Sequence, residues 1–245
     1  MGMKSDKKLI VKGKRLDGRK ADEMRPIKIT AGVLKNADGS CELQFGETKI
    51  VAAVYGPKKV LPRRYEEANR AFLKVNYFMA AFSTSDRCRP GPNRRSTEIS
   101  TVIKSALAPA IFLEKYPQTE ITVHLAVTNA NAGTRTSAIN AATVALIDAG
   151  IEMRDMVTSI AAGKVEDQVI LDLAQDEDNF GQADLPIAIM PRTDEIVLTQ
   201  MDGDMTAAEV KQSYDMCIKA CHEIAKIQRA AIVKKYGNEG GKENE

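Results

Sequence analysis

The 245-residue sequence predicts an α+β fold in which mixed sheets pack with helices. Runs of alternating apolar residues come in groups with helical patterns between them, without the strict strand–helix–strand alternation of a parallel sheet. Hydrophobic residues make up 44% of the chain, enough for a sizeable core. No boundary linker interrupts the sequence, so we expect one domain built of two sheet-and-helix halves.

The expected strands end at turn residues, such as Asp38-Gly39 and Gly46-Glu47. Four strands precede the first helix, at residues 28–30, 41–44, 49–55 and 71–79. Five follow it, at residues 121–127, 159–164, 169–173, 187–190 and 196–199. The last four strands should form two hairpins, the first of them through Glu166-Asp167.

Three segments show helical periodicity. Residues 96–110 place Ile99, Ile103 and Leu107 on one face. Residues 136–149 are rich in alanine and end at Gly150, a frequent helix terminator. Residues 207–236 should form a long amphipathic helix, with one apolar stripe at Val210, Cys217, Cys221, Ile224 and Gln228.

The two ends of the chain are expected to lie outside the folded domain. Residues 1–12 are lysine-rich and lack the apolar stretch of a secretory signal, which indicates a basic, flexible tail. The domain is expected to span residues 13–236, followed by a disordered tail at 237–245. No apolar run approaches the ~20 residues that a membrane helix needs.

The few cysteines and histidines exclude several classes of site. The four cysteines match no zinc or redox spacing, which favours a reducing, cytoplasmic location. The two histidines have no partner pattern near them, which disfavours a histidine metal site or a Ser-His-Asp triad. Because the net charge is only +2, any anion binding must come from local clusters.

One such cluster is basic and occupies two expected loops. The first loop carries Lys58, Lys59, Arg63, Arg64 and Arg70. The second carries Arg87, Arg89, Arg94 and Arg95. Arginine forks match phosphate oxygens, and a position just before a helix adds free N–H groups. The alternative is ordinary solvated loop charge.

A second cluster, Asn-Ala-Asn-Ala-Gly-Thr-Arg-Thr at residues 129–136, follows a strand and opens a helix. Gly133 allows the backbone to approach a ligand, while Thr134 adds a hydroxyl and Arg135 a charge. This pattern is a candidate phosphate cradle, but it lacks the Gly-Lys-Ser/Thr of a Walker loop. A plain helix start with an exposed arginine is the alternative.

The third cluster is acidic and spans residues 176–184. A bend at Gly181 would bring Asp178 and Asp184 to one site. Paired carboxylates suit Mg²⁺ or Mn²⁺, and a single carboxyl can protonate a leaving oxygen. The alternative is a solvated acidic turn between strands. Together the three clusters supply the parts that phosphoryl transfer needs.

Four sequence stretches resemble the ribonuclease PH family, in particular catalytic subunits of the archaeal exosome. They are Gly-Lys-Arg-Leu-Asp-Gly-Arg at residues 13–19 followed by Arg25-Pro26-Ile27, residues 46–57, residues 148–155, and residues 178–186. The resemblance runs from about Lys12 to Tyr236. Phe180 is a departure, because relatives often have tryptophan there, and the loop at residues 64–67 also diverges.

This resemblance implies a ribonuclease PH fold, akin to ribosomal protein S5 domain 2, and 3′-to-5′ phosphorolysis of single-stranded RNA. Inorganic phosphate would release nucleoside diphosphates, and the reverse reaction would add RNA tails. Four residues would hold phosphate: Arg95, Gly133, Thr134 and Arg135. Asp178 would be the catalytic carboxylate, with Asp184 supporting it or sharing Mg²⁺ or Mn²⁺. Arg63 and Arg94 would guide the RNA backbone.

The resemblance also implies partners. Catalytic subunits alternate with an inactive ribonuclease-PH-like paralogue in a six-membered ring, a trimer of heterodimers, capped by RNA-binding subunits. Strand edges and the alanine-rich residues 106–110 are candidates for the interface.

Three rival functions remain open on the sequence alone. A non-catalytic, RNA-binding ring scaffold would not depend on Asp178. A hydrolytic nuclease would release monophosphates without added phosphate. A small-molecule kinase on a related fold is a third alternative, although no glycine- and serine-rich ATP loop is present.

Overall fold

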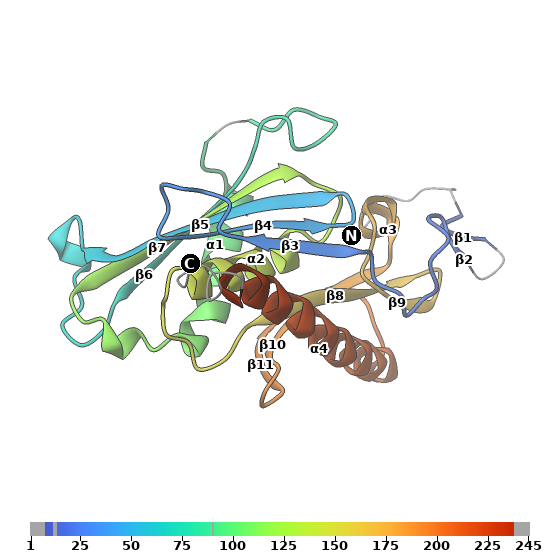
Figure 1. Ribbon diagram of the computed structural model, residues 1–245. Coiled ribbons are helices and arrows are strands. Elements are labelled where there is room, and N and C mark those ends of the chain that lie inside the picture. Colours follow the sequence, from blue (N-terminus) through green and yellow to red (C-terminus); the bar gives the residue numbers. More distant parts are fainter. Residues whose placement is uncertain (1–7, 12–13, 90, 238–245) are drawn as a thin grey trace, which may run out of the picture.

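The structure, a computed structural model, describes residues 8–11, 14–89 and 91–237. Within these residues the strands form two five-stranded sheets and a two-stranded ribbon, with helices packed between and beside them (Figure 1). This arrangement confirms the α+β prediction. No helix in the described ranges is long and apolar enough to cross a membrane.

The first sheet has the strand order β3-β4-β5-β7-β6. Its strands are β3 (Ile27–Ala31), β4 (Gly39–Phe45), β5 (Thr48–Lys59), β6 (Phe72–Met79) and β7 (Thr119–Asn129). All neighbours are antiparallel except β6 and β7, which run parallel. The loop between β5 and β6 contains the short 3₁₀ helix η1 (Arg63–Tyr65).

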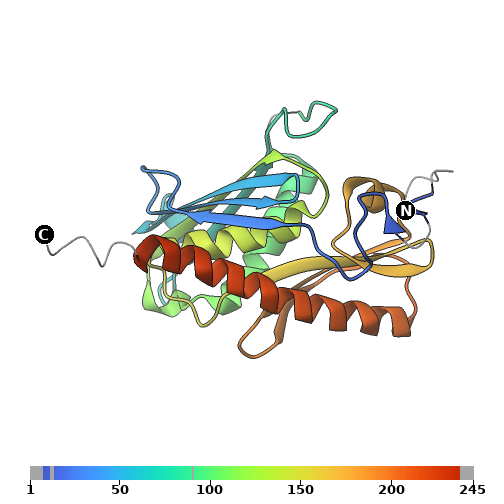
Figure 2. The same ribbon diagram turned by 45° about the vertical axis from the view of Figure 1, so that its right-hand side comes forward.

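The second sheet has the order β11-β10-β8-β9, and β12 pairs with the start of β10. Its strands are β8 (Thr158–Val165), β9 (Gln168–Leu171), β10 (Ala183–Met190), β11 (Glu195–Thr199) and β12 (Asp202–Gly203). The short helix α3 (Gln175–Phe180) connects β9 to β10. The long helix α4 (Ala207–Gly237) runs along both sheets (Figure 2), and its predicted stripe is buried from Cys217 to Gln228.

Two helices fill the space between the sheets. Helix α1 (Arg94–Leu107) packs on β6, and α2 (Thr134–Asp148) packs on β4 and β5 on one side and β8 on the other. Because α2 contacts both sheets, almost every residue in it is buried, and its alanines allow the close approach. After α1 the chain tightens into the 3₁₀ helices η2 (Ala108–Ala110) and η3 (Leu113–Lys115). Pro109 explains why the α-helix ends before the predicted residue 110.

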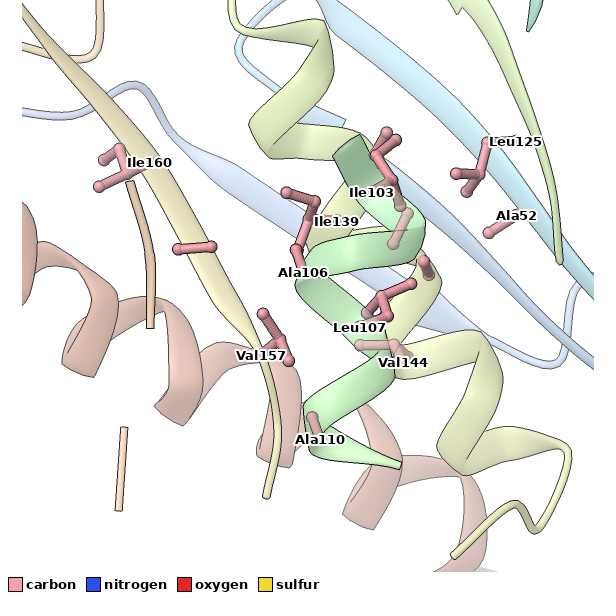
Figure 3. Packing of buried hydrophobic residues seen from close by; sticks show 14 of the residues in the cluster. Ala52, Ile103, Ala106, Leu107, Ala110, Leu125, Ile139, Val144, Val157 and Ile160 are labelled. Atoms are coloured by element: carbon pink, nitrogen blue, oxygen red, sulfur yellow. The ribbon is translucent and has the colours of Figure 1, made fainter. Parts of the chain in front are cut away.

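The alanine-rich stretch at residues 106–110 contributes mainly to the core, so the expectation that it forms an interface is wrong for its buried residues, whereas Pro109 is exposed. Ala106 and Ala110 are fully buried. Figure 3 shows Ala106 next to Ile139 of α2, and Val157, the residue before β8, belongs to the same buried cluster as both alanines. Small side chains at these positions let two layers meet, which is a packing role.

Regular structure is present within the N-terminal stretch that was predicted to be a flexible tail. Residues Ile10–Val11 form β1, which pairs with β2 (Lys14–Arg15). Leu9 is buried against Leu173, and its N–H donates to a carboxylate oxygen of Glu166 at 2.6 Å. The lysine-rich composition gave no sign of these apolar contacts, which Leu9 makes together with the partly buried Ile10. Residues 1–7 and 238–245 lie outside the described residues.

Candidate active site

A cleft of about 640 Å³ lies where the first turns of α1 and α2 face α3, β10 and β12. Six of the residues singled out in the sequence line it: Arg95, Gly133, Thr134, Arg135, Asp178 and Asp184. They come from the three separate sequence clusters. The fold therefore brings cationic, anion-binding and acidic groups together in one concave site.

The start of α1 decides which arginine faces the cleft. Asn93 caps the helix, because its side chain accepts from the N–H of Ser96 at 2.8 Å while its own N–H donates to the Ser96 hydroxyl at 2.9 Å. The helix consequently begins at Arg94, two residues before the predicted start. Neighbouring helical positions differ by about 100° in direction. Arg95 lines the cleft, whereas Arg94 lines a separate groove with Thr97.

Arg63 is also apart from the cleft. It lies in η1, at the far end of β5, and is exposed. Next to it, the ring of Tyr65 stacks on Phe72 with 5.3 Å between centroids, and the guanidinium of Arg64 lies 4.9 Å from the Tyr65 ring. This end of the molecule therefore presents positive charge beside a partly exposed aromatic pair.

The segment that we call the anion loop, residues 130–135, follows β7 and includes the first two residues of α2. Gly133 has a left-handed φ of 60° at the N-terminal cap of α2. A side chain there would be strained, and its Cβ would lie 3.2 Å from the Arg25 guanidinium. The hydroxyl of Thr48, in β5, donates to the carbonyls of Asn131 and Ala132 at 3.0 and 2.9 Å, and these bonds hold the loop against the first sheet. The first turn of α2 thus faces the cleft with a preorganised backbone.

Two side chains of the anion loop have partners on neighbouring elements. Thr134 is buried and accepts a hydrogen bond from the Tyr77 hydroxyl at 3.0 Å, so its own proton stays available to a ligand. Arg135 donates to both carboxylate oxygens of Glu98, at 3.2 and 3.0 Å. Its buried Nε has no hydrogen-bond partner among the described residues. Arg135 is therefore oriented by Glu98, and the residue lines the cleft.

The acidic segment forms a short helix, α3, and not the solvated turn that was the alternative. Glu177 accepts from the N–H of Ala174 at 2.7 Å and is buried against Arg15, with 2.7 Å from its Oε1 to the Arg15 Nε. These contacts stabilise a helix that is too short to persist alone. The chain then bends at Gly181, which places both Asp178 and Asp184 in the cleft.

The two carboxyls have raised pKa values. Burial, followed by the negative charge of Asp178, raises the pKa of Asp184 to about 7. One oxygen of Asp184 is buried with no hydrogen-bond partner among the described residues. Asp178 is exposed at the rim of the cleft. Partial desolvation by the surrounding protein raises its pKa, and the positive charges of Arg95, Arg25 and Arg135 offset part of that rise. Near neutral pH the pair can hold a proton.

Asp202 is a cleft residue that sequence reasoning missed. It lies opposite Asp184 in the pairing of β12 with β10, and its charge raises the pKa of both other carboxyls. Gln200 also lines the cleft and donates to Glu98 at 3.4 Å. No residue pattern in the sequence pointed to either, because only strand pairing brings them to the site.

The carboxyl pair fits a hard divalent cation. Mg²⁺ is typically held by one or two carboxylates together with substrate phosphates and water. Asp178 and Asp184 match that donor set, and one buried oxygen of Asp184 has no hydrogen-bond partner among the described residues. No group of three or more His, Cys, Asp or Glu side chains in the described ranges is arranged to bind a metal without substrate.

Two family models match the chain in succession. The model of domain 1 of the 3′ exoribonuclease family matches residues 23–152, and the model of domain 2 matches residues 155–220. The first match contains the anion loop and Arg95, and the second contains all three acidic cleft residues.

Individual proteins show the same similarity. The exosome complex component Rrp41 of Methanopyrus kandleri is 56% identical over 93% of this chain and 95% of its own length. The same component of Thermoplasma volcanium is 53% identical over 92% and 91%. The crystal structure of rice (Oryza sativa) Rrp46 superposes with a TM-score of 0.81 at 26% identity, over 89% of this chain and 99% of that one. A chain of the Archaeoglobus fulgidus exosome with RNA bound to the active site has the same fold, with a TM-score of 0.76 at 21% identity over 87% and 92%.

Proposed function

Because the chain belongs to the 3′ exoribonuclease family, we propose how the residues of its cleft divide the work of phosphate-dependent, 3′-to-5′ RNA degradation. The family, the ribonuclease PH fold and the exoribonuclease activity expected from the sequence are confirmed by these matches. One observation carries the assignment of roles: Arg95 and the anion loop line the same cleft as Asp178 and Asp184.

Inorganic phosphate binds between Arg95, Arg135 and the first turn of α2. The two guanidinium groups neutralise its charge, and the Thr134 hydroxyl and the backbone N–H groups after Gly133 orient it. Glu98 keeps the Arg135 guanidinium in place before phosphate arrives. A phosphate oxygen then lies ready to attack the terminal phosphodiester of RNA in line with the leaving oxygen.

In the reaction a bond forms between the phosphate oxygen and the terminal phosphorus, while the bond from that phosphorus to the neighbouring O3′ breaks. The O3′ takes up a proton, and a nucleoside diphosphate leaves. The Asp178–Asp184 pair supplies that proton, because the raised pKa values keep a proton on the pair near neutral pH. Asp178, at the rim, contacts the RNA end, and the buried Asp184 shares the proton with it.

Asp178 and Asp184 would also hold Mg²⁺ or Mn²⁺. Such an ion, when bound, supplies positive charge beside the phosphoryl oxygens. A bound cation would also lower the proton affinity of both carboxyls, so the balance between the two roles depends on pH and on metal concentration.

The RNA chain approaches from outside the cleft. Arg94, in its own groove beside the cleft, and Arg63, at the far end of the first sheet, guide the phosphate backbone. These two arginines lie on different elements and neither lines the cleft, and a neighbouring subunit would complete the RNA channel. We propose the ring expected from the sequence, in which this chain alternates with an inactive paralogue beneath RNA-binding cap subunits in the cytoplasm.

Reconstitution tests the shared channel. The purified chain, its mass in solution verified, should degrade RNA weakly, and adding the partner subunit should restore processive degradation. Full processive activity from a verified monomer would contradict the shared channel.

The reverse reaction tests the chemistry independently. Excess nucleoside diphosphate and an RNA primer should give longer RNA and free inorganic phosphate, because one phosphoanhydride is exchanged for one phosphodiester. A wild-type assembly that degrades RNA but never extends it under these conditions would favour a hydrolytic nuclease.

A further inference from the structure

Three arginines of the N-terminal segment, residues 14–25, are buried behind the cleft. Arg15, Arg19 and Arg25 have exposed fractions of only 4%, 9% and 7%. Figure 1 shows this segment beside α3, the helix that carries Asp178. Burying an arginine costs free energy unless its charge is paired, so the partners of these arginines show which parts of the structure the segment connects.

Arg25 connects two parts of the active site. Its Nε and Nη2 donate to the two carboxylate oxygens of Asp172, at 2.8 and 2.7 Å, and its backbone N–H donates to the same carboxylate at 2.8 Å. Its Nη1 donates to the carbonyl of Asn131 in the anion loop. One guanidinium therefore joins the anion loop to the chain that leads into α3.

The two residues that Arg25 joins, Asn131 and Asp172, lie in the segments that carry the anion loop and α3. Asn131 lies two residues before Gly133, and its side-chain oxygen accepts from the N–H of Gln175, the first residue of α3, at 3.1 Å. Asp172 has a left-handed φ of 54°, a conformation that costs free energy for a side-chain-bearing residue. The hydrogen bonds from Arg25 offset that cost and fix the backbone conformation of the segment that leads into α3.

We propose that Arg25 and Asp172 are positioning residues, which set the separation between the phosphate held by the anion loop and the carboxyl of Asp178. This inference rests on the proposed phosphorolytic function. Arg25 is absent from the cleft wall and therefore acts through the loop and through α3. A shift of about 1 Å in such a geometry costs roughly 10²-fold in rate.

The charge of Arg25 supports the same role. The positive charge of Arg25 lowers the pKa of Asp178 and so offsets part of the rise that desolvation causes. The planar fork of arginine is also necessary, because it reaches both Asp172 oxygens and the Asn131 carbonyl at once. A lysine ammonium at the end of a flexible stem cannot hold all three acceptors in one plane.

The test compares Arg25→Lys with Arg19→Lys in the full chain, assembled with its partner. Arg19 is equally buried and also bonds Asp172, at 3.2 Å, but its bonds do not reach the anion loop. Arg25→Lys should lower kcat by roughly 10²-fold and raise the KM for phosphate, while the Kd for RNA measured without phosphate stays unchanged. Arg19→Lys should keep the KM for phosphate within about twofold.

Asp172→Asn keeps the shape of the side chain but weakens its bonds to Arg25. This variant tests the positioning role if Arg25→Lys does not fold. It should reproduce the rise in the KM for phosphate at a temperature well below its melting point. Equal kinetics for Arg25→Lys and Arg19→Lys, or an unchanged KM for phosphate in a folded Asp172→Asn, would overturn the inference. A wild-type assembly that makes no nucleoside diphosphate with phosphate present would instead refute the proposed function.

Discussion

Asp184 of β10 lies directly opposite Asp202 of β12, in the antiparallel pairing that forms one wall of the cleft. Together with Asp178 this pairing gathers three carboxyls beside Arg95 and Arg135. The charges of Asp178 and Asp202 add to burial and raise the pKa of Asp184 to about 7. Asp178 and Asp184 can therefore share a proton, or attract a cation when substrate phosphate completes its ligands, and both properties can be measured.

Asp184 makes stability depend on pH. Its folded-state pKa of about 7 exceeds its ordinary value of 3.8, so the folded protein binds the proton more tightly than the unfolded chain does. Without divalent cations, this group's contribution to the free energy of unfolding should fall as pH rises from about 4 to about 7, by at most about 4 kcal/mol. Asp184→Asn should be more stable than wild type above pH 7. Melting temperatures measured between pH 4.5 and 8 check this, and parallel curves for the two proteins would contradict it.

Asp178→Asn tests the proposed catalytic role of this carboxyl and keeps the shape of the side chain. Turnover should fall by ~10²–10⁴-fold, the range typical of one acid–base group. The Kd for RNA should stay near the wild-type value or become slightly tighter, because a negative charge at the rim is lost. Single-turnover rates and RNA binding, measured on the same assembled protein, separate the two effects. Retention of more than half of the wild-type turnover would exclude Asp178 from catalysis.

Arg94 and Arg95 form a matched pair, since they are neighbours in sequence but line different surfaces. Arg95→Ala should raise the KM for phosphate, because it removes a cation from the proposed phosphate site. Arg94→Ala should leave that KM unchanged and instead weaken RNA binding, reducing the slope of log affinity against log salt by about 0.7. Phosphate titrations and salt-dependent RNA binding check both variants. The same kinetic defect in both would show that the helix start does not separate their roles.

Much of the fold could be predicted because its signals are local. Alternation and turn residues located every strand of the two sheets except β12, and the apolar stripe located α4 to within a residue. The parallel pairing of β6 with β7 was missed, because pairing between strands far apart in sequence leaves no local pattern. The six-residue helix α3 was missed for a related reason: its stability comes from the contact of Glu177 with Arg15, 162 residues away.

The candidate site could be predicted where its residues are consecutive. The anion loop and the bend between Asp178 and Asp184 are both continuous in sequence, and each lines the cleft as the sequence indicated. Asp202 and Arg25 were missed, because strand pairing and burial decide their position. The different directions of Arg94 and Arg95 depended on whether α1 begins at residue 94 or 96, a choice made by the Asn93 cap.

The fate of the attacking phosphate tests the central claim most directly. The assembled protein is given single-stranded RNA and inorganic phosphate that carries a radioactive phosphorus label, and the released nucleotides are separated. If phosphate held by Arg95 and the anion loop is the nucleophile, the label should appear as the β-phosphate of nucleoside diphosphates, and no nucleotide should be released in phosphate-free buffer. Unlabelled nucleoside monophosphates, released equally well without phosphate, would contradict the account.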